Sequence, residues 1–164
     1  MESLKKLNLV SPLKDFIYSK PLIGICLGMQ LLMQESEEFG KHEGLGIIEG
    51  RVVKFNSPIE GSRKLKVPHV GWNRIFPTEK EKWVNTPLEN LKEGSFMYFV
   101  HSFYVEIAES SLALSTSRYG QIEFCSSLKH GNIFAFQFHP ERSGLNGLDI
   151  YRNIASLVKE NANI

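Results

Sequence analysis

The chain has 164 residues, a length that fits one folded domain better than two, so we expect residues 1–164 to form a single domain. Its 42% hydrophobic and 23% charged residues are ordinary for a globular protein, which argues against disorder and against a fibrous repeat. The net charge is only +1 and the basic residues are dispersed, which argues against a partner that is a nucleic acid.

The first third of the chain shows neither a membrane span nor a secretion signal. The most apolar segment, residues 21–33, is interrupted by two glycines and a glutamine and is too short to cross a bilayer. The first residues do not lead into the apolar core of a signal peptide, so we expect a cytoplasmic protein with no membrane partner. In that compartment Cys26 and Cys125 stay reduced, and their different surroundings predict different roles.

The first predicted elements are a helix, a strand and a second helix. Ser11 and Pro12 are typical of a helix N-cap and first position, and the apolar spacing behind them extends this helix to about Lys20. Residues 21–25 form a brief apolar run of the buried-strand type. After Gly28 the apolar spacing becomes helical again.

The middle of the chain is predicted to alternate strands with irregular segments. Residues 52–55 and 96–100 have the composition of strands, whereas 66–73 and 77–94 are predicted as loops with some helical content. Residues 44–50 nearly match a dinucleotide-binding fingerprint, but the third glycine falls one position late and no helical pattern follows. We therefore predict a turn that enters a strand there.

The last part of the chain predicts a hairpin followed by a helix. Residues 121–125 and 133–138 are strand-like, and the turn residues between them lie at 129–132. Three phenylalanines of the second strand share one face. The apolar face of the final helix is predicted to comprise Tyr151, Ile154, Ala155 and Val158.

Cys26 lies between the first predicted strand and the second predicted helix. Residues 24–28 read Gly-Ile-Cys-Leu-Gly, the spacing of a nucleophile elbow, in which glycines permit a sharp turn that projects the middle side chain. The helix N-terminus is expected to lower the pKa of the thiol. On this pentapeptide alone, an inert buried cysteine is the alternative.

A histidine and a carboxylate that could activate this thiol lie late in the chain. His139 and Glu141 are two residues apart at the end of a predicted strand, so in an extended segment they point the same way. Glu141 can then orient the ring of His139 while the other ring nitrogen faces the thiol. An incidental pair at a solvated strand end is the alternative, but both motifs follow strands, where open α/β sheets gather their active sites.

Two segments resemble a known family. Residues 24–32 and 137–143 are similar to the two signature blocks of the class I (triad) glutamine amidotransferases. The resemblance implies an α/β fold with an open, mostly parallel sheet and flanking helices. It also implies a glutaminase whose catalytic triad is Cys26, His139 and Glu141, which forms a thioester with its substrate.

The same resemblance implies a substrate site. Gln30 and Glu38 would bind glutamine, and the backbone near His101 and Ser102 would complete the pocket. The backbone N–H of Leu27, directly after the nucleophile, would help bind the oxyanion. From the residues alone, Gln30 and Glu38 could equally be a solvated helix face, and His101 a strand-end histidine with its hydrogen bonds satisfied.

Within this family, residues 68–73 and 98–102 resemble the glutaminase subunits of imidazole glycerol phosphate synthase, an enzyme of histidine biosynthesis. This implies that the partner is the (β/α)₈-barrel synthase subunit, which receives the ammonia in a heterodimer. The residues that this resemblance places at the interface are Pro68, Trp72, Asn73 and Arg142. Without the resemblance, Trp72 would be interpreted as a core aromatic residue.

The family pattern also begins before the part that matches this sequence. The preceding segment normally holds the first strands and a loop that donates a second N–H to the oxyanion hole. Loss of such a donor costs about 2.7 to 4 kcal/mol of transition-state stabilisation in acyl-transfer enzymes. We therefore interpret residues 1–164 as an N-terminally truncated sequence rather than as a degraded relative.

Two other functions stay open on the sequence alone. The glutaminase could serve a sugar-modifying amidotransferase, or the chain could be an inactive docking module. The five histidines are dispersed and lack the spacing of a zinc site, so neither a metal nor another cofactor is expected. Cys125, in an apolar strand, is interpreted as a core residue.

Overall fold

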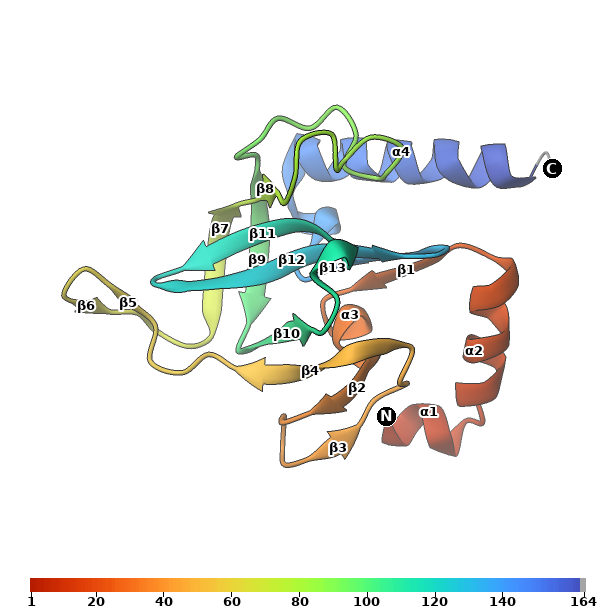
Figure 1. Ribbon diagram of the computed structural model, residues 1–164, viewed down its shortest axis with the longest axis horizontal. Coiled ribbons are helices and arrows are strands. Elements are labelled where there is room, and N and C mark those ends of the chain that lie inside the picture. The colour runs from red at the N-terminus through yellow and green to blue at the C-terminus, as the bar shows by residue number, and fades with distance from the viewer. Residues whose placement is uncertain (163–164) are drawn as a thin grey trace.

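The structure of the protein is a computed structural model that describes the backbone of residues 1–162 and the side chains of residues 1–159 (Figure 1). The helices are α1 (Glu2–Lys6), α2 (Val10–Ser19), α3 (Leu27–Leu31) and α4 (Gly144–Ala162), with short 3-10 turns η1 (Ser110–Leu112) and η2 (Pro140–Arg142). The strands are β1 (Leu22–Ile25), β2 (Met33–Ser36), β3 (His42–Glu43), β4 (Ile48–Lys54), β5 (Ile59–Glu60), β6 (Arg63–Lys64), β7 (His69–Arg74), β8 (Phe76–Pro77), β9 (Phe96–His101), β10 (Phe103–Ile107), β11 (Ala113–Tyr119), β12 (Ile122–His130) and β13 (Ile133–Phe136).

The strands form open, mixed sheets. The largest sheet has the order β1-β13-β12-β11-β8, and a second has the order β10-β4-β2-β3. Only β1 with β13 and β2 with β4 are parallel among the described strand pairs. The expected α/β architecture is therefore present, but the expectation of a mostly parallel sheet is wrong, because tight hairpins such as β12–β13 join their strands in antiparallel order.

Two hydrophobic cores lie on opposite faces of the largest sheet. Along β13, Ile133 and Ala135 belong to one core, whereas Phe134 and Phe136 belong to the other, as the alternation of a strand requires. Helices α1 and α2 pack against the first core and α4 packs against the second, so helices flank both faces (Figure 1). The predicted shared face of Phe134, Phe136 and Phe138 is confirmed.

Several predicted elements are confirmed with shifted limits. The predicted first helix is α2, which begins at Val10, and Ser11 makes no side-chain cap. The helix after the nucleophile ends at Leu31, because the chain turns there into β2. Among the side chains of α4 that the structure describes, the fully buried apolar one is Ile150. The predicted apolar face is therefore displaced, because Tyr151 and Val158 are exposed.

Strand β7 was predicted as a loop, and this prediction is wrong. Residues 69–74 pair with all of β9 in an antiparallel ribbon. The inward residues of β7 include His69 and Asn73, which satisfy their polar groups with hydrogen bonds, so the usual alternation of apolar and polar residues is missing from the sequence.

The outward face of the β7–β9 ribbon is mostly apolar and exposed. Val70 and Trp72 on β7 and Phe96 on β9 are each about half exposed.

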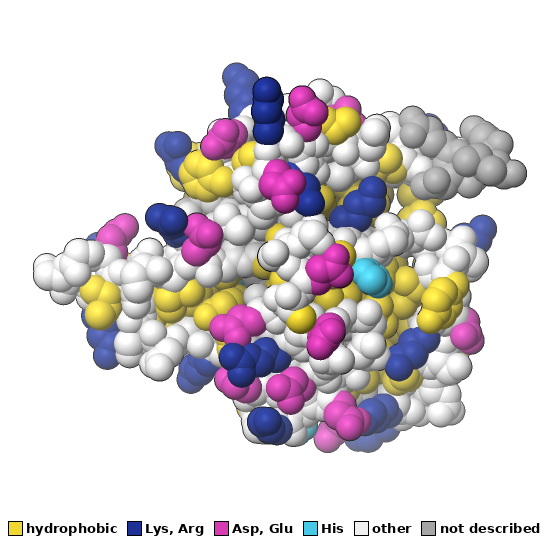
Figure 2. Space-filling model, viewed as in Figure 1, with side chains coloured by type: hydrophobic (Ala, Val, Ile, Leu, Met, Phe, Trp, Pro, Cys, Tyr) yellow, Lys and Arg dark blue, Asp and Glu magenta, His cyan; other side chains and the backbone are white. Residues whose placement is uncertain are grey.

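On the face of the molecule that Figure 2 shows, acidic and basic side chains are interspersed rather than gathered by sign. Within the described residues, no helix is both long enough and apolar enough to traverse a bilayer.

Candidate active site

The two predicted catalytic motifs meet at the carboxyl ends of neighbouring parallel strands. Strand β1 pairs with β13 so that Ile25 lies opposite Phe136. The next backbone N–H, that of Cys26, donates to the carbonyl of Phe136 at 2.7 Å. The chain continues from β13 through Gln137 to His139, so both motifs leave the sheet at the same edge.

Cys26 occupies the sharp turn that its sequence predicts. Its backbone has φ 49° and ψ −103°, a sparsely populated combination for a residue with a side chain. The turn is possible because Gly24 packs closely on the next helix: a Cβ there would lie 3.1 Å from the backbone of Gly28. The strained backbone thus projects the thiol from the end of β1.

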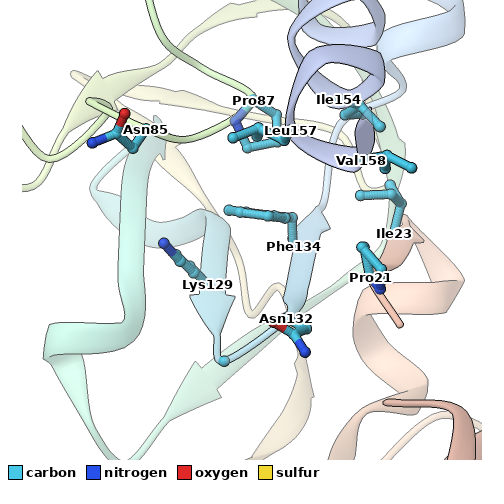
Figure 3. Close-up of a pocket in the computed structure, with 11 residues that line it drawn as sticks. Pro21, Ile23, Asn85, Pro87, Lys129, Asn132, Phe134, Ile154, Leu157 and Val158 are labelled. Atoms are coloured by element: carbon cyan, nitrogen blue, oxygen red, sulfur yellow. The ribbon is translucent and has the colours of Figure 1, made fainter. Parts of the chain in front are cut away.

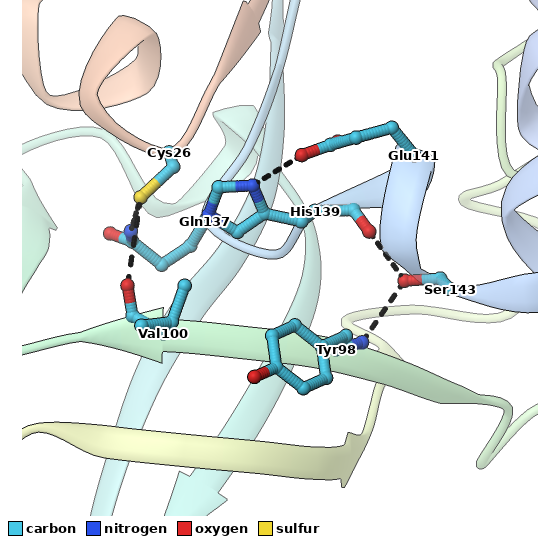
Figure 4. A network of polar contacts seen from close by, with 7 residues as sticks. All are labelled: Cys26, Tyr98, Val100, Gln137, His139, Glu141 and Ser143. Atoms are coloured by element: carbon cyan, nitrogen blue, oxygen red, sulfur yellow. Dashed lines mark hydrogen bonds and ion pairs between the residues drawn. The ribbon is translucent and has the colours of Figure 1, made fainter.

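The sulfur of Cys26 lies between two polar groups. The thiol donates weakly to the carbonyl of Val100 at 3.9 Å, and Nε2 of Gln137 donates to Sγ at 3.6 Å (Figure 4). Burial raises the pKa of Cys26 above its ordinary value, opposed by hydrogen bonds from the backbone of Leu27 and from Gln137. The expected lowering of this pKa is wrong, because desolvation of the buried thiol outweighs the hydrogen bonds that favour the thiolate.

His139 is held by its neighbours on three sides. Its Nδ1 contacts Oε1 of Glu141 at 2.5 Å, and its backbone N–H donates to the carbonyl of Tyr98 at 2.9 Å. Ser143 donates to the carbonyl of His139 at 2.7 Å (Figure 4). Although Glu141 lies in the 3-10 turn η2 rather than in an extended segment, the carboxylate still reaches the ring.

The other ring nitrogen of His139 remains available. In the described part of the chain, Nε2 is buried and has no hydrogen-bond partner. Figure 4 shows the ring between the side chains of Glu141 and Cys26 in that view, with Nδ1 directed to Glu141. A buried ring nitrogen without a partner is suited to exchange a proton with a group that enters the site.

Three of the residues predicted to handle substrate line one cavity. Leu27, Gln30 and Glu38 border a cavity of about 670 Å³. Nε2 of Gln30 donates to the carbonyl of Phe103 at 3.0 Å and to Oε1 of Gln137 at 3.1 Å, which leaves its own carbonyl oxygen as an acceptor. The cavity therefore presents an amide and a carboxylate near the nucleophile.

The other two predicted substrate residues lie elsewhere. The ring of His101 is buried and bonds to the carbonyl of Phe103 and to His69, so its side chain does not face this cavity. The carbonyl of Ser102 accepts from the backbone N–H of Phe55. The backbone of the same strand end does approach the nucleophile, through the carbonyl of Val100.

The predicted interface residues are mostly at the surface. Pro68 and Trp72 are exposed, and Arg142 is exposed with its guanidinium 4.3 Å from the ring centre of Tyr98. Asn73 differs, because its side chain turns inward and donates to the carbonyl of Arg118 at 2.7 Å. Three of the four predicted residues are thus accessible to a partner.

Two polar residues near the site had no role in the sequence interpretation. Gln137 contacts the sulfur; it is the first residue of the segment 137–143 that resembles a family signature, but no role was assigned to it. His69 is buried beside His101, and a loop was predicted at its position. Among the described residues, no group of three or more His, Cys, Asp or Glu could hold a metal ion.

A separate hollow, lined by both apolar and polar residues, lies away from these residues. It has a volume of about 210 Å³ and lies between α4 and the start of β1, where Pro21, Phe134 and Ile154 line it (Figure 3). None of the predicted site residues contributes to its wall. The larger cavity beside Leu27 is therefore the one relevant to the candidate site.

The start of α4 is packed so closely on η2 that Gly147 should tolerate no side chain. A Cβ at Gly147 would lie 1.8 Å from the carbonyl oxygen of Pro140, a backbone atom. We expect Gly147→Ala to lower the free energy of unfolding by about 3 kcal/mol, through displacement of η2 or α4. The midpoint and slope of urea unfolding measure this change.

Gly28→Ala is the matched control, because a Cβ at Gly28 meets no atom within 4 Å. It should leave the unfolding midpoint nearly unchanged. Equal stability of the two variants would contradict the close packing of α4 on η2.

Comparisons with known proteins agree with this geometry. The family model for glutamine amidotransferase class-I matches residues 5–155. The HisH subunit of imidazole glycerol phosphate synthase from Sulfurimonas denitrificans is 45% identical over 93% of this chain and 71% of its own length. The corresponding subunit from Aquifex aeolicus is 44% identical over 93% of this chain and 69% of its own length.

Solved structures agree at the level of the fold. A putative GMP synthase subunit from Thermoplasma acidophilum has a TM-score of 0.62 at 19% identity. The match covers 97% of this chain and 68% of that protein's chain. A glutamine amidotransferase from Thermotoga maritima has a TM-score of 0.54 at 17% identity, and the match covers 98% of this chain and 56% of that protein's chain. From the family match and the close relatives, the chain belongs to the class I glutamine amidotransferases, in the branch of the HisH subunits of imidazole glycerol phosphate synthase.

Proposed function

We propose that this chain hydrolyses glutamine and supplies the ammonia to the synthase subunit of imidazole glycerol phosphate synthase in histidine biosynthesis. The observation that carries the proposal is the placement of Cys26 and the His139–Glu141 pair at the ends of two hydrogen-bonded parallel strands. The close HisH relatives support the identity of the synthase. We propose that residues 1–164 act as one domain in the cytoplasm, where free thiols such as Cys26 persist.

The proposed chemistry is amide hydrolysis through a thioester. Sγ of Cys26 attacks the side-chain carbonyl carbon of glutamine, while Nε2 of His139 accepts the thiol proton and then gives it to the departing nitrogen. Ammonia leaves and a thioester remains. Water, deprotonated by His139, then attacks the thioester carbon, so that glutamate leaves and the thiol is restored. Glu141 keeps the ring oriented and stabilises its charged form.

The proposed substrate site is the cavity beside α3. Gln30 and Glu38 would bind the α-ammonium group of glutamine, because the amide oxygen of Gln30 and the carboxylate of Glu38 are both acceptors for it. The backbone N–H of Leu27 would stabilise the oxyanion. The backbone around His101 and Ser102 would complete the site at the end of β9.

The proposed partner is a (β/α)₈-barrel protein that docks on the outward face of the β7–β9 ribbon. Pro68, Trp72 and Arg142 would contact it, and Asn73 would join if its side chain turned outward. Strand β9 supports this placement, because the carbonyls of Tyr98 and Val100 contact His139 and Cys26 respectively. A barrel bound there would lie directly beside the site where ammonia is released. We propose neither a nucleic acid nor a membrane as a partner.

The function is tested by an assay of glutamate release with and without the barrel subunit. We expect the complex to form glutamate from glutamine and to form the imidazole product in step with it. A complex that forms but releases no glutamate would support an inactive docking module. Glutamate release that never yields the imidazole product would direct the ammonia to another acceptor.

Trp72→Ala should weaken the complex with the barrel subunit. Trp72 is 55% exposed and its ring packs edge-on against Tyr98, so it is available as an aromatic anchor. We expect the dissociation constant, measured by calorimetry, to rise about thirtyfold, equivalent to about 2 kcal/mol.

Tyr18→Ala is the control for this change. Tyr18 is 89% exposed but lies on α2, outside the proposed interface. Its loss should leave the dissociation constant unchanged. Equal effects of Trp72→Ala and Tyr18→Ala would exclude the β7–β9 ribbon as the docking face.

A further inference from the structure

A pair of buried histidines lies outside the proposed chemistry. His69 on β7 and His101 on β9 are paired in register and are 4% and 5% exposed. Their rings meet at 3.1 Å, between Nδ1 of His69 and Nε2 of His101. Aromatic rings surround them, including those of Phe55 and Phe99. Two imidazoles in such a place need a reason, because burial of polar groups is costly.

The donor and the acceptor of each hydrogen bond in the histidine pair can be assigned. Nδ1 of His101 lies 2.8 Å from the carbonyl of Phe103, which can only accept, so this nitrogen carries the proton. Burial lowers the pKa of His101 to about 3 and that of His69 to about 4, so both rings are neutral near pH 7. Nε2 of His101 therefore accepts from Nδ1 of His69, whose Nε2 lies 3.4 Å from Nδ2 of Asn73.

The same carbonyl orients two glutamine amides. The carbonyl of Phe103 also accepts from Nε2 of Gln30 at 3.0 Å, which fixes the NH₂ side of that amide. The second proton of Gln30 Nε2 then meets Oε1 of Gln137 at 3.1 Å. Because its oxygen is engaged in this way, Gln137 must turn its own NH₂ group to Sγ of Cys26.

We propose that His69 and His101 are positioning residues for the nucleophile, which hold the Phe103 carbonyl in place so that Gln30 and Gln137 direct an amide N–H at the sulfur of Cys26. The chain of bonds is continuous from the ribbon to the thiol. An N–H aimed at sulfur stabilises the thiolate, so the pair should set the reactivity of Cys26. The effect on glutamine hydrolysis rests on the proposed function, whereas the effect on the thiol does not.

The test measures the rate at which iodoacetamide alkylates Cys26 in the purified chain at pH 8, with mass spectrometry of the Cys26 peptide. In His101→Phe the donor to the carbonyl of Phe103 is lost. We expect alkylation of Cys26 about tenfold slower, because the thiolate then loses the hydrogen bond from Gln137. In His101→Asn the side-chain amide lies where Nδ1 was and can still donate to Phe103. This variant should react at the rate of the parent chain.

A double variant separates positioning from stability. His101→Phe and His101→Asn each leave Nδ1–H of His69 without its acceptor, so both should unfold at lower urea concentration than the parent. His69→Phe combined with His101→Phe removes both polar partners and should recover stability, yet it should still react slowly. Stability and reactivity then move independently across the set.

The outcomes distinguish this proposal from the proposed function. Parental alkylation in His101→Phe, or rates that follow stability through all variants, would overturn the positioning role. If the double variant does not fold, the comparison of His101→Phe with His101→Asn still decides the matter. If the variants show the expected alkylation rates but the parent chain releases no glutamate with the barrel subunit, the positioning role stands and the glutaminase function is rejected.

Discussion

Cys26→Ala should abolish glutamine-dependent synthesis by the complex with the barrel subunit, while synthesis from added ammonia continues. The thiol is the only proposed nucleophile, and loss of a catalytic nucleophile in comparable acyl-transfer enzymes costs on the order of 10⁴-fold or more in rate. Alanine keeps the Cβ, so the backbone at position 26 meets the same steric restriction, and removal of one sulfur atom opens no large cavity. The folded complex should therefore persist, so that ammonia still reaches the barrel from solution.

The measurement compares product formation with glutamine and with ammonium as nitrogen source. Cys125→Ala is the matched control, because Cys125 is a buried thiol of the core whose pKa burial raises to about 12. It should keep glutamine-dependent synthesis. Product formation from glutamine by the Cys26→Ala complex would show that another group is the nucleophile.

The sequence predicted the nucleophile and its activating pair because both depend on local chemistry. Glycines on either side of Cys26 specify a tight turn. The pair of His139 and Glu141 can be recognised because its two members are only two residues apart at the end of a predicted strand. Their meeting requires that β1 and β13 be neighbours, a long-range pairing that spacing alone does not determine. Here the resemblance to a family supplied what the local pattern lacked.

The missed features have physical causes. Strand β7 has His69 and Asn73 on its inward face, so it lacks the apolar alternation that identifies a strand. The raised pKa of Cys26 follows from burial, which is a property of the folded molecule. The predicted interface residues include Asn73, whose amide turns inward because a carbonyl on β11 lies within its reach.

Acid should destabilise this protein in a pH range where most carboxylates remain charged. Burial lowers the pKa of His69 to about 4 and that of His101 to about 3, from 6.5 in the unfolded chain. As pH falls below 6.5 the unfolded chain binds protons that the folded chain refuses, so the stabilising contribution present at higher pH is lost. By pH 5 this loss amounts to about 2 kcal/mol for each histidine.

Urea unfolding at pH 7.5 and at pH 5 measures this loss, and the double variant His69→Phe with His101→Phe identifies its source. In the parent chain the free energy of unfolding should fall by several kcal/mol between the two conditions. In the double variant this part of the fall should vanish, because neither of these two imidazoles is left to be protonated. An equally steep fall in both chains would place the acid sensitivity elsewhere and would show that the two rings lie in a more polar environment than their burial indicates.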